Sequence, residues 1–177
     1  MAENISIEKY GIRIQTIEDH DAEFILKLRT DNNLSRFLSH TSTDLNAQRE
    51  WIRRYKEREK EGKEYYFIAL HNGTRYGTTR IYNIESDCFE VGSWLFSPDA
   101  PIGVSILTDI IGREFAFKKL GARKCKFTVR RENHTVIKYH KSYKPILIKE
   151  TQEDFFFMLT REAFETYKNK LINVIIK

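Results

Sequence analysis

The chain has 177 residues, of which 41% are hydrophobic and 13% aromatic, and these values predict one globular domain over residues 1–177. The net charge of +5 favours an anionic small molecule, while 25 acidic side chains mixed among 30 basic ones argue against a nucleic-acid partner. No apolar run reaches membrane-spanning length, the N-terminus lacks a basic-then-apolar leader, and the two isolated cysteines show no metal-ligand spacing, so we expect no membrane partner, no metal and a cytoplasmic location.

The N-terminal third predicts an edge strand followed by two helices. Residues 5–14 have the character of a strand interrupted at Gly11, and residues 19–30 place apolar side chains on one helical face. Asp44 is a favourable N-cap for the second helix, which we expect to bury Trp51 and Tyr55. The other face of that helix is a run of mixed charges, which indicates a solvated surface rather than a nucleic-acid site.

The middle of the chain predicts an antiparallel meander of three strands, at residues 65–70, 75–84 and 89–96. Asn72-Gly73, between the first two strands, is the strongest hairpin signal in the sequence. Pro98 and Pro101 end the third strand, because each removes a backbone donor from the ladder.

A helix and a further strand follow this meander. Residues 102–117 have helical apolar spacing, Gly121 stands where a C-terminal cap is expected, and residues 124–130 alternate like a strand with one buried face. So short a connection predicts that residues 89–96 and 124–130 pair in parallel. The helix N-terminus at Gly103 offers unpaired N–H groups and a positive dipole end, which suit a pyrophosphate.

The C-terminal part predicts a short helix, a closing hairpin and a last helix, at residues 133–141, 146–150 with 154–159, and 161–170. Asn133 is a natural N-cap for the short helix. The pattern as a whole predicts an α/β fold with a mixed, mostly antiparallel sheet and a parallel strand–helix–strand core.

This order of elements resembles the GNAT (Gcn5-related) N-acetyltransferases over most of the chain. Residues 133–141 look like the family's Asn-x-x-(small)-Ile-x-x-(Tyr/His)-(Glu/Lys) segment. The family's acyl-CoA loop, (Gln/Arg)-x-x-Gly-x-(Gly/Ala), is matched by residues 100–105 in its glycine and its small last residue but not in its polar first residue. Tyr143-Lys144-Pro145 replaces the Leu/Cys-Gly-Phe that usually follows. Residues 28–32 and 48–52 resemble the branch of ribosomal-protein and nucleotide-amino-sugar N-acetyltransferases.

The resemblance implies the GNAT fold, acetyl-CoA as co-substrate, and a set of cofactor-binding positions. Main-chain groups at the end of the central strand would hold the pantetheine, a loop would hold the pyrophosphate, and an asparagine side chain would contact the pantetheine arm. These positions are Trp94, Leu95 and Phe96 on the strand, Ile102, Gly103, Val104 and Ser105 in the loop, and Asn133.

The resemblance also suggests residues for the chemical step. Glu90 in the central strand is the candidate base, although a solvent-facing glutamate is an equally good interpretation. His140 stands where many relatives carry the tyrosine that protonates the departing thiolate; Tyr139, one residue earlier, is the alternative for this role, and a surface histidine is the alternative for His140 itself. His40 and Tyr82 are candidates for lining the acceptor pocket, and His40 is also typical of a plain surface loop.

The favoured function is acetyl transfer from acetyl-CoA to a primary amine by direct attack on the thioester. A nucleotide-linked amino sugar is the leading small-molecule acceptor, because the upstream segments resemble the sugar-directed branch. A protein N-terminus or an antibiotic amine stays open, since acceptor specificity lies in variable loops. A catalytically inactive acyl-CoA-binding module of the same fold is the alternative from another class. We expect either a monomer or a homodimer.

Overall fold

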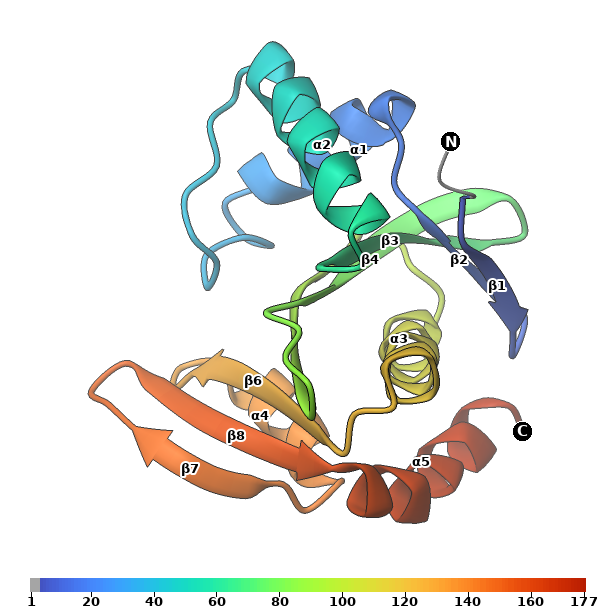
Figure 1. Ribbon diagram of the computed structural model, residues 1–177, viewed down its shortest axis with the longest axis vertical. Helices are drawn as coiled ribbons and strands as arrows, with labels where there is room; N and C mark the ends of the chain where they lie inside the picture. The colour runs from blue at the N-terminus through green and yellow to red at the C-terminus, as the bar shows by residue number, and fades with distance from the viewer. Residues whose placement is uncertain (1–3) are drawn as a thin grey trace.

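The computed structural model describes residues 4–177, where an eight-stranded sheet is covered by helices on both faces (Figure 1). Part of the expectation about a leader falls on residues 1–3, which lie outside the described residues. The elements in chain order are β1 (Ser6–Lys9), β2 (Ile12–Thr16), the short 3-10 helix η1 (Asp19–Asp21), α1 (Ala22–Thr30), α2 (Leu45–Lys60), β3 (Tyr65–His71), β4 (Thr74–Tyr82), β5 (Cys88–Phe96), α3 (Val104–Leu120), β6 (Lys124–Arg130), α4 (His134–Lys141), β7 (Ile146–Glu150), β8 (Asp154–Thr160) and α5 (Arg161–Ile175). Across the part of the chain that is described, no helix is long and apolar enough to cross a membrane.

The sheet order is β1-β2-β3-β4-β5-β6-β8-β7, and only β5 and β6 run parallel. All other neighbours are antiparallel, including the β3–β4–β5 meander that the Asn72-Gly73 turn opens. The prediction of a mixed, mostly antiparallel sheet around a parallel strand–helix–strand core is therefore confirmed, with α3 as the connecting helix.

Two predicted element boundaries were wrong. Residues 5–14 form a hairpin rather than one strand: Tyr10 and Gly11 both adopt positive φ, 56° and 74°, and reverse the chain between β1 and β2. The sequence signal was weak because Tyr10 stands where Asn or Asp is usual. The last helix ends at Ile175, not at residue 170, because Ile172 is buried and Ile175 packs on the core.

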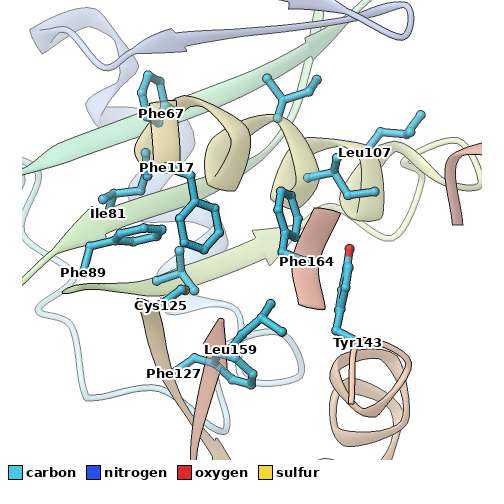
Figure 2. Packing of buried hydrophobic residues seen from close by; sticks show 14 of the residues in the cluster. Phe67, Ile81, Phe89, Leu107, Phe117, Cys125, Phe127, Tyr143, Leu159 and Phe164 are labelled. Carbon is cyan, nitrogen blue, oxygen red and sulfur yellow. The ribbon is translucent and has the colours of Figure 1, made fainter. Parts of the chain in front are cut away.

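The two faces of β3 pack into two separate cores, which explains why its first five residues, 65–69, are all buried. Phe67 and Ala69 join the larger core with α3, whereas Tyr66 and Ile68 point the other way into a smaller core under α1 and α2. Successive side chains of a strand alternate between the faces of its sheet, so an apolar run of this kind is what a doubly covered strand requires. Figure 2 shows the larger core, which contains Phe67, Ile81, Phe89, Phe117, Phe127 and Phe164.

The sheet opens in the middle. The parallel pairing of β5 and β6 covers only Cys88 to Glu90 against Lys124 to Lys126. Beyond Glu90, β5 continues along β4 as far as Phe96, while β6 continues along β8. A β-bulge at Ser93, which has φ 48°, adds one residue to β5 opposite β4 and bends the strand away from β6. The main chain of β5 is thereby left without a strand partner on one side.

The backbones of β4 and β5 approach each other closely beside the bulge, so a glycine substitution there tests how strongly the strands are constrained. Gly77 pairs with Phe96, and an added Cβ would overlap both the Leu95 carbonyl oxygen and the Phe96 ring. We predict that Gly77→Ala lowers the free energy of unfolding by about 1–3 kcal/mol, measured by chemical denaturation, since the overlapped carbonyl belongs to the backbone and cannot rotate away.

Gly112→Ala is the matched control for this change. Its added Cβ would meet Thr79 Cγ2 at 3.3 Å, and alanine gains helix propensity, so the net effect should stay within about 1 kcal/mol. Equal effects of the two substitutions would show that the bulge does not constrain the strand.

Candidate active site

A cleft of about 100 Å³ occupies the opening between β5 and β6. Its walls come from both halves of the sheet and from α4, and include Val91, Ser93, Trp94, Phe127, Asn133 and His140. The free side of β5 therefore lines a narrow slot, which suits a thin, extended ligand that adds its own hydrogen bonds to an unpaired strand.

A second, wider cavity of about 400 Å³ lies under α2 and the loop that precedes it. Its wall includes Arg29, His40, Trp51, Tyr66 and Arg80, together with Ser93. Ser93 borders both spaces, so the slot and the cavity approach each other at the bulge of β5. Ser93 is the residue that the walls of the two spaces share.

The turn before α3 has the features of an anion site. Gly103 has φ 89°, which favours glycine, and a Cβ here would also overlap Ile175 of α5. Val104 N–H donates to the Pro101 carbonyl and Leu107 N–H to the Gly103 carbonyl. The N–H groups of residues 105 and 106 find no acceptor among residues 4–177 and are available at the positive end of the helix dipole.

Trp94 connects this turn to α4. Its indole Nε1 donates to the Ser105 carbonyl oxygen at 3.0 Å, and its ring stacks on Tyr139 with centroids 5.1 Å apart. Asn133 begins α4 by accepting a hydrogen bond from Val136 N–H on its side-chain oxygen, which leaves its amide NH₂ as a donor at the wall of the slot. Leu95 is buried and pairs with Thr78, so it can bind a ligand only through the main chain, whereas Phe96 is partly buried and its ring lies over Gly77.

A buried polar network lies beneath the slot. Arg113, fully buried on α3, donates through Nε to Asp109 Oδ2 at 2.9 Å, and the Tyr139 hydroxyl donates to the same oxygen at 2.7 Å. Tyr143 continues the chain, with its hydroxyl 3.1 Å from that of Tyr139. Arg113 also donates through Nη1 to the Cys125 thiol on β6. The network ties α3 to α4 and to β6.

This network sets the protonation state of His140. Arg113 Nη2 lies 3.4 Å from His140 Nδ1, and because a guanidinium can only donate, Nδ1 accepts and the ring proton is on Nε2. Burial and the Arg113 charge lower the pKa of His140 to about 3, so the ring is neutral near pH 7. His140 thus lines the slot as an uncharged hydrogen-bond donor, held against Phe127 at a centroid distance of 4.3 Å.

Tyr139 is engaged elsewhere. Its hydroxyl bonds to Asp109 and Tyr143, and burial together with the Asp109 charge raises its pKa well above the ordinary value. It does not line the slot. Of the two candidates for the residue that faces the thiolate, His140 is therefore the one whose side chain reaches the slot.

The other predicted site residues lie in different parts of the molecule. His40 lines the wide cavity. Glu90 and Tyr82 pair across β4 and β5 on the sheet face that carries Arg80, and neither lines the slot or the wide cavity. Burial and the Glu90 charge raise the pKa of Tyr82, which stays a neutral phenol beside that carboxylate. Ile102 is fully exposed at the turn.

Sequence reasoning missed several residues that the folded chain brings to these spaces. Asp109 and Arg113 stand four apart on the largely apolar N-terminal part of α3, a spacing that allows an ion pair within the helix. Trp51 was expected in the core, yet it is only partly buried and lines the wide cavity. Arg29 and Arg80 gave no signal, because a single arginine in a helix or a strand is ordinary.

Comparisons with known proteins agree with this architecture. A family model described as an acetyltransferase (GNAT) domain matches residues 12–143. The solved apo structure of FdhC, a nucleotide-linked sugar GNAT, is similar at 27% sequence identity with a TM-score of 0.86, covering 97% of this chain and 99% of that one. No curated protein sequence matches the chain closely enough to be counted as a relative.

Two further solved structures share the fold at lower identity. One is the ribosomal-protein-S5-alanine acetyltransferase of Vibrio fischeri, at 15% identity and a TM-score of 0.77, covering 90% of this chain and 98% of that one. The other is the spermidine N-acetyltransferase of Vibrio cholerae in complex with CoA and spermine, at 13% identity and a TM-score of 0.76, covering 89% of this chain and 99% of that one.

The lowered pKa of His140 predicts a specific pH dependence of stability. The pKa is about 3 in the folded protein against an ordinary value of 6.5, so between these pH values the unfolded chain binds more protons at this residue. Stability is therefore lost as the pH falls from about 6.5 towards 3. Chemical denaturation of the wild type and of His140→Gln should show a steeper loss for the wild type over this range. Parallel curves would mean that His140 is not neutral and buried.

Proposed function

The chain belongs to the GNAT acetyltransferase family, and on that premise we propose that it transfers the acetyl group of acetyl-CoA to the primary amine of a nucleotide-linked amino sugar. The observation that carries the proposal is the approach of the slot and the wide cavity at Ser93, on two sides of one strand. The likeness to a nucleotide-linked sugar GNAT over 97% of the chain supports the choice of acceptor.

In this proposal the slot holds the acetyl-CoA, which supplies the thioester. The N–H groups of residues 105 and 106 bind its pyrophosphate at the N-terminus of α3. The unpaired main chain of β5 and the Asn133 amide hold the pantetheine arm, and the arm points towards Ser93. Backbone N–H groups at the bulge are placed to stabilise the oxyanion that develops on the thioester carbonyl.

The reaction is direct attack by the neutral amine. The amine nitrogen forms a bond to the carbonyl carbon, the carbon–sulfur bond breaks, and the electron pair leaves on the thiolate. His140 donates its Nε2 proton as a hydrogen bond to that sulfur rather than transferring it, because an imidazole with a pKa of about 3 has no second proton to give near pH 7.

The attacking amine must also lose a proton to a base. Glu90 is our candidate base, and since neither its side chain nor that of Tyr82, its cross-strand neighbour, lines the slot or the wide cavity, a water molecule would carry the amine proton to it. The Tyr82 ring covers Gly92 next to the bulge, and the Arg80 guanidinium, which lines the wide cavity, lies 4.8 Å from the centroid of that ring.

An acceptor panel with free-thiol detection tests the proposed function. We expect acetyl-CoA turnover with nucleotide-linked amino sugars, and much weaker turnover with peptides bearing a free N-terminus, with aminoglycosides and with spermidine. Preference for one of the latter acceptors would replace the amino sugar. CoA binding without turnover on any amine would favour an inactive binding module.

The second kinetic prediction separates His140 from Tyr139. His140→Ala removes a donor that acts mainly in the transition state, so kcat and kcat/KM should fall together, on the order of 10²-fold. Tyr139→Phe removes the hydrogen bonds to Asp109 and Tyr143 but no group that lines the slot, so it should lower stability while leaving kcat within a few-fold of the wild type. The reverse outcome would assign the thiolate contact to Tyr139. Denaturation curves for both variants show that each is folded under assay conditions.

A further inference from the structure

We infer that the wide cavity is an anion site, in which Arg29, Arg54 and Arg80 bind the diphosphate of the acceptor. The inference deepens the proposed function and rests on it for the identity of the acceptor. It makes these three arginines specificity-determining residues, which select an acceptor by charge before its amine reaches Ser93.

The charge of the cavity wall is the first argument. The wall contains three guanidinium groups and no carboxylate. The remaining side chains are neutral hydroxyls, one amide, one alanine methyl group, an exposed histidine and the aromatic rings of Trp51 and Tyr66. A cavity with this lining attracts phosphate oxygens, and guanidinium groups match their geometry with paired N–H donors.

Arg80 is held in place rather than left to swing in solvent. Its Nε donates to Glu64 Oε1 at 2.5 Å, and the same buried carboxylate accepts from Arg58 Nε at 2.7 Å. The Arg80 guanidinium also lies 5.2 Å from the centroid of the Trp51 ring. Because one carboxylate, Glu64, is shared by the two cations Arg58 and Arg80, the three groups together keep a net positive charge. The contact also orients the Arg80 side chain in advance, which lowers the side-chain entropy lost when a ligand binds.

The Arg29 guanidinium lies next to Ser93, the residue that the cavity shares with the slot. Its Nε donates to Thr41 Oγ1 at 2.8 Å, and its Nη1 lies 3.5 Å from Ser93 Oγ. Among the residues of the described range, no carboxylate lies within ion-pair distance of Arg29. A protonated amine that arrives at Ser93 meets this cation, which favours the neutral, nucleophilic form of the amine.

The Tyr66 hydroxyl is an independent sign of a ligand. Tyr66 is 2% exposed, it borders the cavity, and its hydroxyl has no hydrogen-bond partner within residues 4–177. A buried hydroxyl without a partner is costly, so a polar ligand group that reaches it is stabilised.

The same charges disfavour cationic acceptors. A polyamine or a basic peptide would place its positive charges beside three guanidinium groups in a wall that contains no carboxylate; Arg80 and Arg54 have ion-pair partners in Glu64 and Glu50, which are not among the residues of that wall, whereas Arg29 has none within residues 4–177. This chain therefore differs in expected selectivity from the spermidine N-acetyltransferase that shares its fold at 13% identity.

Arg54→Gln and Arg53→Gln form the matched pair for the test. Both arginines lie on α2, both contact Glu50, and their side chains are 66% and 67% exposed, but only Arg54 lines the cavity. Calorimetry measures the binding of uridine diphosphate and thymidine diphosphate, with acetyl-CoA saturating so that the cofactor site is filled. We expect Arg54→Gln to weaken binding about tenfold or more and Arg53→Gln to leave it unchanged.

Kinetics with two acceptors complete the test. Arg54→Gln should raise the KM of a nucleotide-linked amino sugar while leaving the KM of acetyl-CoA unchanged. The KM of the free amino sugar, which lacks the diphosphate, should rise much less, and Arg53→Gln, outside the cavity wall, should change neither acceptor's KM.

The outcomes separate the two claims. If no amine is acetylated but nucleoside diphosphates bind and Arg54→Gln weakens them, the proposed function fails and the anion site stands. If amines are acetylated but diphosphates do not bind, or the two variants are indistinguishable, the anion site is overturned and the proposed activity survives.

Discussion

The buried ion pair between Asp109 and Arg113 is the interaction on which the site depends. Placing both charges inside the protein carries a large desolvation cost, which is offset only when the remaining donors and acceptors are satisfied. Here Tyr139, His140 and Cys125 supply those partners from α4 and β6. A well-packed apolar pair would stabilise the fold at least as well. We therefore attribute the role of the pair to position: it fixes α3, α4 and β6 in one arrangement and leaves His140 with its proton on the ring nitrogen not bonded to Arg113.

The second constraint is the separation of β5 from β6 beyond Glu90. A continuous ladder would close the slot and use the backbone groups of β5 internally. The bulge at Ser93 prevents this and brings the slot close to the acceptor cavity. The two constraints complement each other, because the ion pair holds the far wall of the opening that the bulge creates. In the proposed function the acetyl donor and the acceptor would meet at Ser93, beside which Arg29 lies.

The sequence predicted the elements that depend on local signals. A few neighbouring residues are enough to predict such local features. Examples are the Asn72-Gly73 turn, the helix caps at Asp44 and Asn133, and the glycine before α3. The hairpin at Tyr10-Gly11 was missed because its first turn residue is atypical, and the end of α5 because tertiary packing of Ile172 decides it. The arginines of the acceptor cavity were missed for a different reason. Arg29, Arg54 and Arg80 come from α1, α2 and β4, and nothing in a single sequence indicates that these positions converge.

The central claim is that Arg113 holds His140 as a neutral ring with its proton on Nε2, and ring NMR tests it most directly. A long-range ¹H–¹⁵N correlation spectrum of the histidine rings distinguishes the two tautomers and the charged form. The account predicts that His140 shows only the neutral Nε2–H tautomer, unchanged from about pH 8 down to about pH 5. An Nδ1–H tautomer, or protonation of the His140 ring within this pH range, would contradict it.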